Sequence, residues 1–290
     1  MNAHRNGKIA RFPKHLREEL DRQFGAVVFL GAVPDFCVVT RARLDYAGGM
    51  LWKKTWAPEA VLALLAGIVA AFLFGVLTGG LLQHEHVAGF TDPESVGNVL
   101  LTTLSFHGVA IVLGTFFLWS QQSSWREALG RTGWRHCLAL SCVILMAVTP
   151  VLFGMKWVAD FIWMRLFDHV EDEAAVTLIL GSKLWLRCYL IFFAVILAPV
   201  AEEFVFRGLL FSTAKRYGYT WSGRVGVSLL FALVHFNAPT FLPLFVLALA
   251  LTWLYEVTEG LLAPMIAHSL FNTGNLILLL LAEKYNLLGT

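Results

Sequence analysis

The sequence predicts an all-α fold, a polytopic transmembrane helix bundle of about seven spans. Of its 290 residues, 58% are hydrophobic and 14% are charged, whereas an average soluble domain carries roughly 25% charged residues. Several apolar stretches approach or exceed the ~18 to 20 residues that cross a bilayer as a helix. These stretches are continuous, while the strands of a membrane barrel would show as alternating segments of about ten residues. The predicted class is therefore a helical membrane protein.

The expected spans follow one another along the chain. Trp52 and Trp56 precede the first span and suit a membrane interface. Pro150 is expected to kink the third span. Residues 161–183 mix acidic and apolar side chains and predict a loop with a surface helix. The predicted spans cover residues 60–82, 99–119, 137–158, 184–213, 225–236, 241–255 and 264–281.

The chain is expected to contain three parts. Residues 1–58 form a basic, cytoplasmic amino-terminal extension, in which the short apolar stretch 24–39 predicts an interfacial or packed segment. A signal peptide is the alternative for this region, but no small-residue cleavage site follows convincingly. Residues 59–183 hold the amino-terminal transmembrane helices and the loop. Residues 184–290 are expected to form the transmembrane core.

The distribution of basic residues predicts the orientation. Residues 83–98 contain no Lys or Arg, whereas residues 120–136 contain Arg126, Arg131 and Arg135. Cytoplasmic loops carry the excess of Lys and Arg. We therefore expect an integral protein of the cytoplasmic (inner) membrane with its amino terminus inside. No nucleic-acid motif accompanies the basic residues, so no nucleic-acid partner is expected.

An unusual group of charges lies in the fourth span, within LIFFAVILAPVAEEFVFRGLLF. Ionisable residues inside a span cost several kcal/mol unless they are paired or face a wet cavity, so Glu202, Glu203 and Arg207 are functional candidates. Glu203 and Arg207 are spaced i, i+4 with the acid first, which is the favourable order for an ion pair. Glu202 points about 100° away on the helix. We expect Arg207 to hold Glu203 and leave Glu202 available for chemistry.

Polar residues in two later spans join this group. At about 1.5 Å per residue, Glu202 lies roughly 20 Å from the Lys215 end of its helix and His235 about 15 Å from Arg224, so the two can share a depth. His268 and Asn272 share a helix face at i, i+4. These side chains can orient a water or stabilise an oxyanion, and two histidines with one carboxylate also make a zinc set. Spacing alone leaves both chemistries open.

One further histidine, His107, lies in an earlier span than these polar residues. His107 lies in the second span, far along the chain from the other polar residues. A single histidine in a span can serve as a hydrogen bonder that packs helices. We expect this packing role for His107.

Three short motifs carry a family resemblance. EEFVFR matches EExxxR, FALVH matches FxxxH and HSLFN matches HxxxN, in this order on successive or near-successive spans. The chain resembles the CPBP family of intramembrane endopeptidases, which includes the type II CAAX prenyl endopeptidases. The resemblance covers roughly residues 184–285, and it implies that the transmembrane core, residues 184–290, is catalytic.

The resemblance implies a role for each motif residue. Glu202 would be the general base that activates the attacking water, with His235 helping to hold that water. Glu203 and Arg207 would support the site. His268 and Asn272 would stabilise the oxyanion formed at the scissile carbonyl. The family implies glutamate-dependent hydrolysis without a bound metal, so no cofactor is expected, although zinc stays open.

The expected partners are the lipid bilayer and a membrane-associated peptide or protein substrate, reached from the cytoplasmic side or from lipid. Two alternatives remain at this stage. One is a non-catalytic membrane scaffold or immunity factor with the same fold. The other is a transporter whose intramembrane charges form a proton or substrate path. A transporter should show paired broken helices or repeated halves, and the sequence shows no such symmetry.

Overall fold

The computed structural model describes residues 27–28, 40–41, 56–91, 95–167 and 174–285. The chain divides into two compact units, Met1–Gly48 and Gly49–Thr290. In the first unit, strands β1 (Val27–Val28) and β2 (Thr40–Arg41) pair antiparallel. The remainder of the apolar stretch predicted at 24–39 lies outside the described residues, so its interfacial role stays a prediction.

The described part of the second unit is helical. Three π-helical segments, labelled η, continue neighbouring α-helices in this part of the chain. The elements are α2 (Pro58–His84), α3 (Val96–Thr103), η2 (Leu104–Gly108), α4 (Val109–Ser120), α5 (Trp125–Leu129), α6 (Trp134–Phe167), α7 (Ala174–Gly181), α8 (Leu184–Phe192), η3 (Phe193–Leu197), α9 (Ala198–Glu203), η4 (Phe204–Phe211), α10 (Ser212–Arg216), α11 (Thr220–Leu233), α12 (Ala238–Thr258) and α13 (Leu262–Lys284).

Six continuous helices among the described residues are long and apolar enough to cross a membrane: Pro58–His84, Val96–Ser120, Trp134–Phe167, Leu184–Arg216, Ala238–Thr258 and Leu262–Lys284. They coincide with six of the predicted spans, and the all-helical membrane class is confirmed. The seventh predicted span corresponds to α11, which has 14 residues. At ~1.5 Å per residue α11 measures about 21 Å, shorter than the ~30 Å hydrocarbon core.

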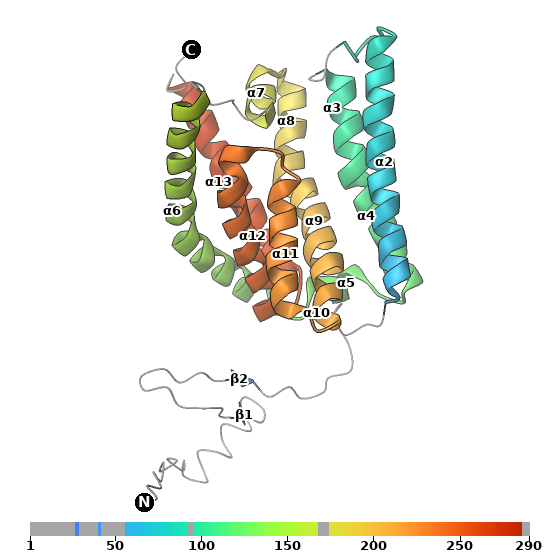
Figure 1. Ribbon diagram of the computed structural model, residues 1–290, viewed down its shortest axis with the longest axis vertical. Coiled ribbons are helices and arrows are strands. Elements are labelled where there is room, and N and C mark those ends of the chain that lie inside the picture. Colours follow the sequence, from blue (N-terminus) through green and yellow to red (C-terminus); the bar gives the residue numbers. More distant parts are fainter. Residues whose placement is uncertain (1–26, 29–39, 42–55, 92–94, 168–173, 286–290) are drawn as a thin grey trace, which may run out of the picture. The chain divides into compact units, whose positions relative to one another are not determined.

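The end of the third span differs from the prediction. The third span was expected to end at residue 158 and to be followed by a loop, but α6 continues to Phe167. The added turns carry Phe161, Met164 and Leu166, whose apolar side chains stay exposed. Such a helix end is stable in lipid, where exposed apolar surface carries no penalty. The helix expected within residues 161–183 corresponds to α7. The α6 helix contains Pro150 and bends along its length (Figure 1).

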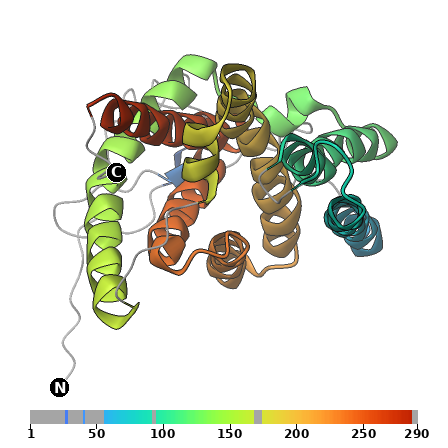
Figure 2. The same ribbon diagram turned by 90° about the horizontal axis from the view of Figure 1, so that it is seen from above.

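The bundle has a central helix with a group of helices on each side. The central helix runs from α8 through η3, α9 and η4 to α10 (Figures 1 and 2). On one side, α2 packs on α3, η2 and α4, and this group reaches the centre where η2 and α4 contact α9. On the other side, α11 packs on η4 and α12, while α6 packs on α12 and α13. The centre of the bundle is therefore lined by residues from both halves of the chain.

The apolar side chains lie both inside and outside the bundle. The interior cluster includes Phe204, Leu209 and Phe211 of η4, all fully buried. Outer faces are equally apolar: on α2, Leu62, Phe74 and Leu77 are each more than 60% exposed. A helix that is apolar all round requires burial in protein or lipid. The protein is therefore an integral membrane protein.

Candidate active site

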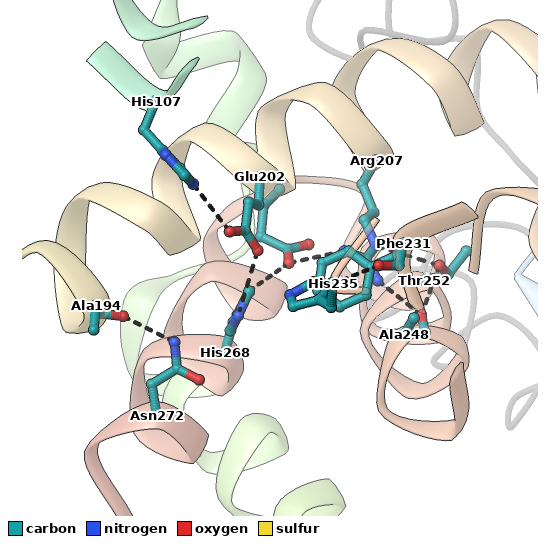
Figure 3. Close-up of polar contacts among 11 residues, drawn as sticks. His107, Ala194, Glu202, Arg207, Phe231, His235, Ala248, Thr252, His268 and Asn272 are labelled. Atoms are coloured by element: carbon teal, nitrogen blue, oxygen red, sulfur yellow. Dashed lines mark hydrogen bonds and ion pairs between the residues drawn. The ribbon is translucent and has the colours of Figure 1, made fainter. Parts of the chain in front are cut away.

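Each of the three π-helical segments carries a group of the polar site. His107 lies in η2, Ala194 in η3 and Arg207 in η4. A π-turn inserts a residue into the α-helical pattern, re-aims the side chains that follow, and is found most often at functional sites. The three irregular turns therefore mark the place in the bundle where polar groups meet (Figure 3).

The innermost part of the site is an ion pair within one helix. Nη1 of Arg207 donates to Oε1 of Glu203 at 2.9 Å, and both side chains are fully buried. The guanidinium also donates through Nη2 to the carbonyl oxygen of Ala248 at 2.9 Å and through Nε to the hydroxyl of Thr252 at 3.4 Å. The predicted i, i+4 pair is thus present, and α12 supplies the additional acceptors that a buried guanidinium needs.

Phe231 of α11 connects the residues of this inner part. Its ring centroid lies 4.9 Å from Cζ of Arg207, a cation–π contact. It also lies 5.8 Å from the His268 ring and 5.1 Å from the Phe206 ring, both edge-on. The aromatic residue of the FALVH motif is fully buried. It therefore packs the ion pair and His268 from one side.

His268 of α13 lies between the two glutamates. Its Nδ1 is 2.9 Å from Oε1 of Glu203, and its Nε2 is 3.8 Å from Oε2 of Glu202. An ionised carboxylate only accepts hydrogen bonds, so Nδ1 carries a proton and donates it to Glu203. This bond fixes the ring with Nε2 directed at Glu202 (Figure 3).

Glu202 has more open surroundings than its neighbour. Its side chain is 13% exposed, and Oε1 lies 3.1 Å from Nε2 of His107. Its second oxygen, Oε2, is buried without a hydrogen-bond partner among the described residues, apart from the longer approach of His268. A buried carboxylate oxygen in this state requires a donor, either water or a ligand. Oε2 is therefore the oxygen available to a reacting molecule.

His235 lies at a helix end, which the sequence did not predict. It was expected inside a span extending to residue 236, but α11 ends at Leu233 and His235 belongs to the turn that leads to α12. The backbone N–H of His235 bonds to Ala232, leaving the carbonyl of Phe231 without its usual helical partner. Nδ1 of His235 donates to that carbonyl at 2.7 Å.

This hydrogen bond determines how His235 can react. With the proton on Nδ1, the neutral ring keeps a lone pair on Nε2. The residue is exposed, whereas Glu203 and Arg207 are sealed inside the bundle. His235 can therefore accept a hydrogen bond from a molecule that enters the site.

Asn272 lies one turn beyond His268 on α13. Its Nδ2 donates to the carbonyl oxygen of Ala194 in η3 at 2.8 Å. A carboxamide has two N–H donors, so this bond orients the side chain and leaves a second donor. Asn272 thus meets the requirement for a fixed oxyanion donor.

The described residues contain no group of three His, Cys, Asp or Glu side chains placed to hold a metal ion. His107 and His268 approach different oxygens of Glu202, and His235 bonds to the main chain. That no cofactor is needed stays a prediction.

Residues 183–274 match the sequence model of a protein family described as Type II CAAX prenyl endopeptidase Rce1-like. We call these matched residues the CAAX endopeptidase domain, after the family to which they are similar. All six motif residues fall inside it, and the resemblance drawn from the motifs is confirmed. No curated protein and no solved structure matches the chain. The protein is thus an integral membrane protein in which residues 183–274 are similar to a family of membrane proteases.

The CAAX endopeptidase domain does not contain the whole site. His107, which contacts Glu202, lies in η2, outside the matched residues. His107 makes the hydrogen bond between helices that was expected of it, but its partner, the candidate catalytic carboxylate of Glu202, was not predicted. An available signal had pointed to it, because an ionisable residue within a span is a functional candidate by default. The sequence around His107 contains no motif that would indicate a contact with the EExxxR motif.

Proposed function

We propose that this protein is an intramembrane endopeptidase that hydrolyses a peptide bond of a membrane-associated peptide or protein, with Glu202 as the general base. The observation that carries the proposal is the state of Oε2 of Glu202. This oxygen is buried, has no hydrogen-bond partner in the described part of the chain and faces His268, while the neighbouring carboxylate is bonded by Arg207. A carboxylate held in this way is suited to take a proton from water.

The first step is the attack of water. Oε2 of Glu202 accepts a proton from a water whose second hydrogen is held by Nε2 of His235. The resulting hydroxide oxygen bonds to the scissile carbonyl carbon, and the electron pair of the C=O π bond moves to the carbonyl oxygen. The product of this step is a tetrahedral oxyanion with a protonated Glu202.

The oxyanion is stabilised by two donors on α13. Asn272 offers the amide N–H that Ala194 does not occupy. His268 offers Nε2–H when its ring is doubly protonated, while Nδ1–H keeps its bond to Glu203. Donors held in advance at the position of developing charge each contribute on the order of 10²–10³ in rate.

The second step breaks the C–N bond. The oxyanion re-forms the carbonyl, the leaving nitrogen takes the proton from Glu202, and the products are a carboxylic acid end and an amine end. Glu202 returns to its ionised form. Glu203 and Arg207 take no part in proton transfer and serve to hold His268 and α12 in position.

The substrate class follows from the position of the site. Glu202 lies in a membrane-spanning helix, so a peptide bond must reach the bilayer to be cut. The name of the matched family refers to prenylated CAAX proteins, and a lipid-anchored substrate of this kind is one form that the proposal takes. We also propose a cytoplasmic-membrane location with the amino terminus inside, since Arg126, Arg131 and Arg135 lie in the connection after α4.

The test compares membrane proteomes of cells that express wild-type protein or Glu202→Gln at equal levels. New peptide termini present only with the wild type would support hydrolysis and would reveal whether the cut proteins are lipid-modified. Identical sets of termini, with Glu202→Gln still supporting the phenotype that deletion removes, would replace the proposal with the non-catalytic scaffold. Purified protein cutting an identified substrate should keep its rate in the presence of a metal chelator.

A further inference from the structure

We propose that His107 is a positioning residue for Glu202, supplied by the amino-terminal helices to complete a site that lies otherwise within the CAAX endopeptidase domain. The inference rests on the proposed function of Glu202. The observation behind it is the 3.1 Å contact between Nε2 of His107 and Oε1 of Glu202, across 95 residues of sequence. Both side chains are largely buried, at 17% and 13% exposed.

The protonation of His107 follows from its two contacts. Nδ1 lies 3.3 Å from the carbonyl oxygen of Thr103, which can only accept, so Nδ1 carries a proton. The contact between Nε2 and Glu202 then holds one further proton. It resides on Nε2 both when the carboxylate is ionised and after Oε2 of Glu202 has taken the proton of water, because Oε1 still accepts a hydrogen bond in either state. The pair thus keeps its hydrogen bond in both states of the general base.

The charges around the site agree with this assignment. Glu202 and Glu203 carry two negative charges, and Arg207 supplies one positive charge, which is bonded to Glu203. His268 donates to Glu203 through Nδ1, and His235 donates to a carbonyl. A proton on His107 therefore places a positive charge within hydrogen-bond distance of Glu202, whereas Nε2 of His268 lies further away at 3.8 Å.

The ring of His107 contacts two other aromatic rings. Its centroid lies 4.8 Å from the ring of Phe106 and 4.8 Å from the ring of Phe193, both edge-on. Thr103, whose carbonyl accepts from Nδ1, is tied in turn to Tyr189 of α8 through a 2.8 Å bond between hydroxyls. The ring therefore presents Nε2 to Glu202 in one fixed direction.

A glycine brings the His107 helix close enough. Gly114 lies seven residues after His107 on the same face of the continuing helix. A methyl group at Gly114 would lie 2.5 Å from Cε1 of Phe204, the residue that follows Glu203. The lack of a side chain at position 114 thus allows α4 to pack against the central helix beside Glu202.

The test separates hydrogen bonding from packing by two substitutions at one position. His107→Gln keeps an N–H donor near Nε2, whereas His107→Phe keeps a ring between Phe106 and Phe193 without a donor. We expect His107→Gln to cleave a substrate with a kcat at least ten-fold above that of His107→Phe, with KM values within about three-fold of each other, because His107 does not touch the substrate. His107→Leu replaces the Phe variant if thermal unfolding in detergent shows that the latter does not fold.

The outcomes are decided by the ratio of the two rates. Equal rates for the donor and non-donor variants, or a faster Phe variant, would overturn the role of His107. Glu202→Gln, measured beside them, tests the proposed function by itself. If Glu202→Gln cuts as fast as wild type, the general-base assignment fails whatever His107 does. If Glu202→Gln is inactive and the His107 variants are equally fast, only the inference about His107 fails.

Discussion

Glu202 and Glu203 are consecutive residues of one helix, yet their surroundings are opposite. Glu203 is fully buried and its Oε1 accepts from both Arg207 and His268. Glu202 is 13% exposed, and among the described residues its Oε1 is hydrogen-bonded to His107 while its Oε2 has no hydrogen-bond partner. The 100° between adjacent helical residues turns the carboxylate of Glu203 towards Arg207 and His268 and that of Glu202 towards His107 of η2. The comparison teaches that one carboxylate can stabilise the packing of the helices while its neighbour is left available for the proposed proton transfer.

The largest effect on stability is expected from breaking the buried ion pair between Glu203 and Arg207. Arg207→Met leaves the carboxylate of Glu203 buried without its guanidinium. Breaking a buried ion pair in this way costs about 3–5 kcal/mol of unfolding free energy. Thermal and denaturant unfolding in detergent would measure the loss.

The matched control is another i, i+4 pair. Lys156 and Asp160 of α6 form an ion pair at 2.6 Å, with both side chains 32% exposed. Lys156→Met should cost only about 0–1 kcal/mol, since exposed pairs contribute little. Equal losses for Arg207→Met and Lys156→Met would contradict the supporting role given to the buried pair.

A large effect on rate is expected from the oxyanion donors. Asn272→Ala removes an amide N–H and should lower kcat by on the order of 10²–10³. Asn275→Ala, three residues further along α13 at an exposed position, serves as the control and should change kcat by less than about two-fold. Cleavage kinetics of the two variants would decide, and similar rates would remove Asn272 from the proposed mechanism.

An intermediate effect is expected where the two helix groups meet. Gly114→Ala introduces a methyl group against Phe204, and overpacking of this kind typically costs about 1–3 kcal/mol. The shift of α4 should also lower kcat by loosening the contact between His107 and Glu202. Gly80→Ala on α2, where no atom lies within 4 Å of the added methyl, should leave both unfolding and cleavage unchanged. A Gly114→Ala protein with wild-type stability would show that the close approach is unimportant.

The smallest effect is expected from the outer acceptor of Arg207. Thr252→Val removes the hydroxyl that lies 3.4 Å from Nε. Loss of one neutral partner, with the bonds to Glu203 and Ala248 retained, should cost about 0.5–1.5 kcal/mol of unfolding free energy. Denaturant titration would measure it. A loss as large as that of Arg207→Met would show that Thr252 is as important to the buried pair as Arg207 itself.

Much of the fold could be predicted because a bilayer imposes simple rules. A continuous apolar stretch of about 20 residues must form a helix in lipid, so six spans appear near their predicted residues. The exact end of α11 could not be predicted, because Val234 and Phe236 are apolar and read as part of a span. The chain nevertheless turns there, with Phe236 at a φ of +49° and Asn237 capping α12 by accepting from the N–H of Thr240.

The site was predictable only where sequence spacing determines contact. The pair of Glu203 and Arg207 follows from i, i+4 spacing within one helix. The contact of His107 with Glu202 depends on how separate helices pack, through Gly114 and Phe204, and no local pattern encodes it. The bonds of Asn272 to Ala194 and of His235 to Phe231 likewise use carbonyls at irregular or terminal turns.

The division of roles between the two glutamates is tested most directly by a paired measurement on purified Glu202→Gln and Glu203→Gln. Cleavage rate and unfolding temperature are recorded for both variants against wild type. The account predicts that Glu202→Gln loses cleavage by on the order of 10²–10⁴ while unfolding near the wild-type temperature, and that Glu203→Gln unfolds at a clearly lower temperature. A Glu202→Gln protein that still cleaves, or a Glu203→Gln protein as stable as wild type, would contradict it.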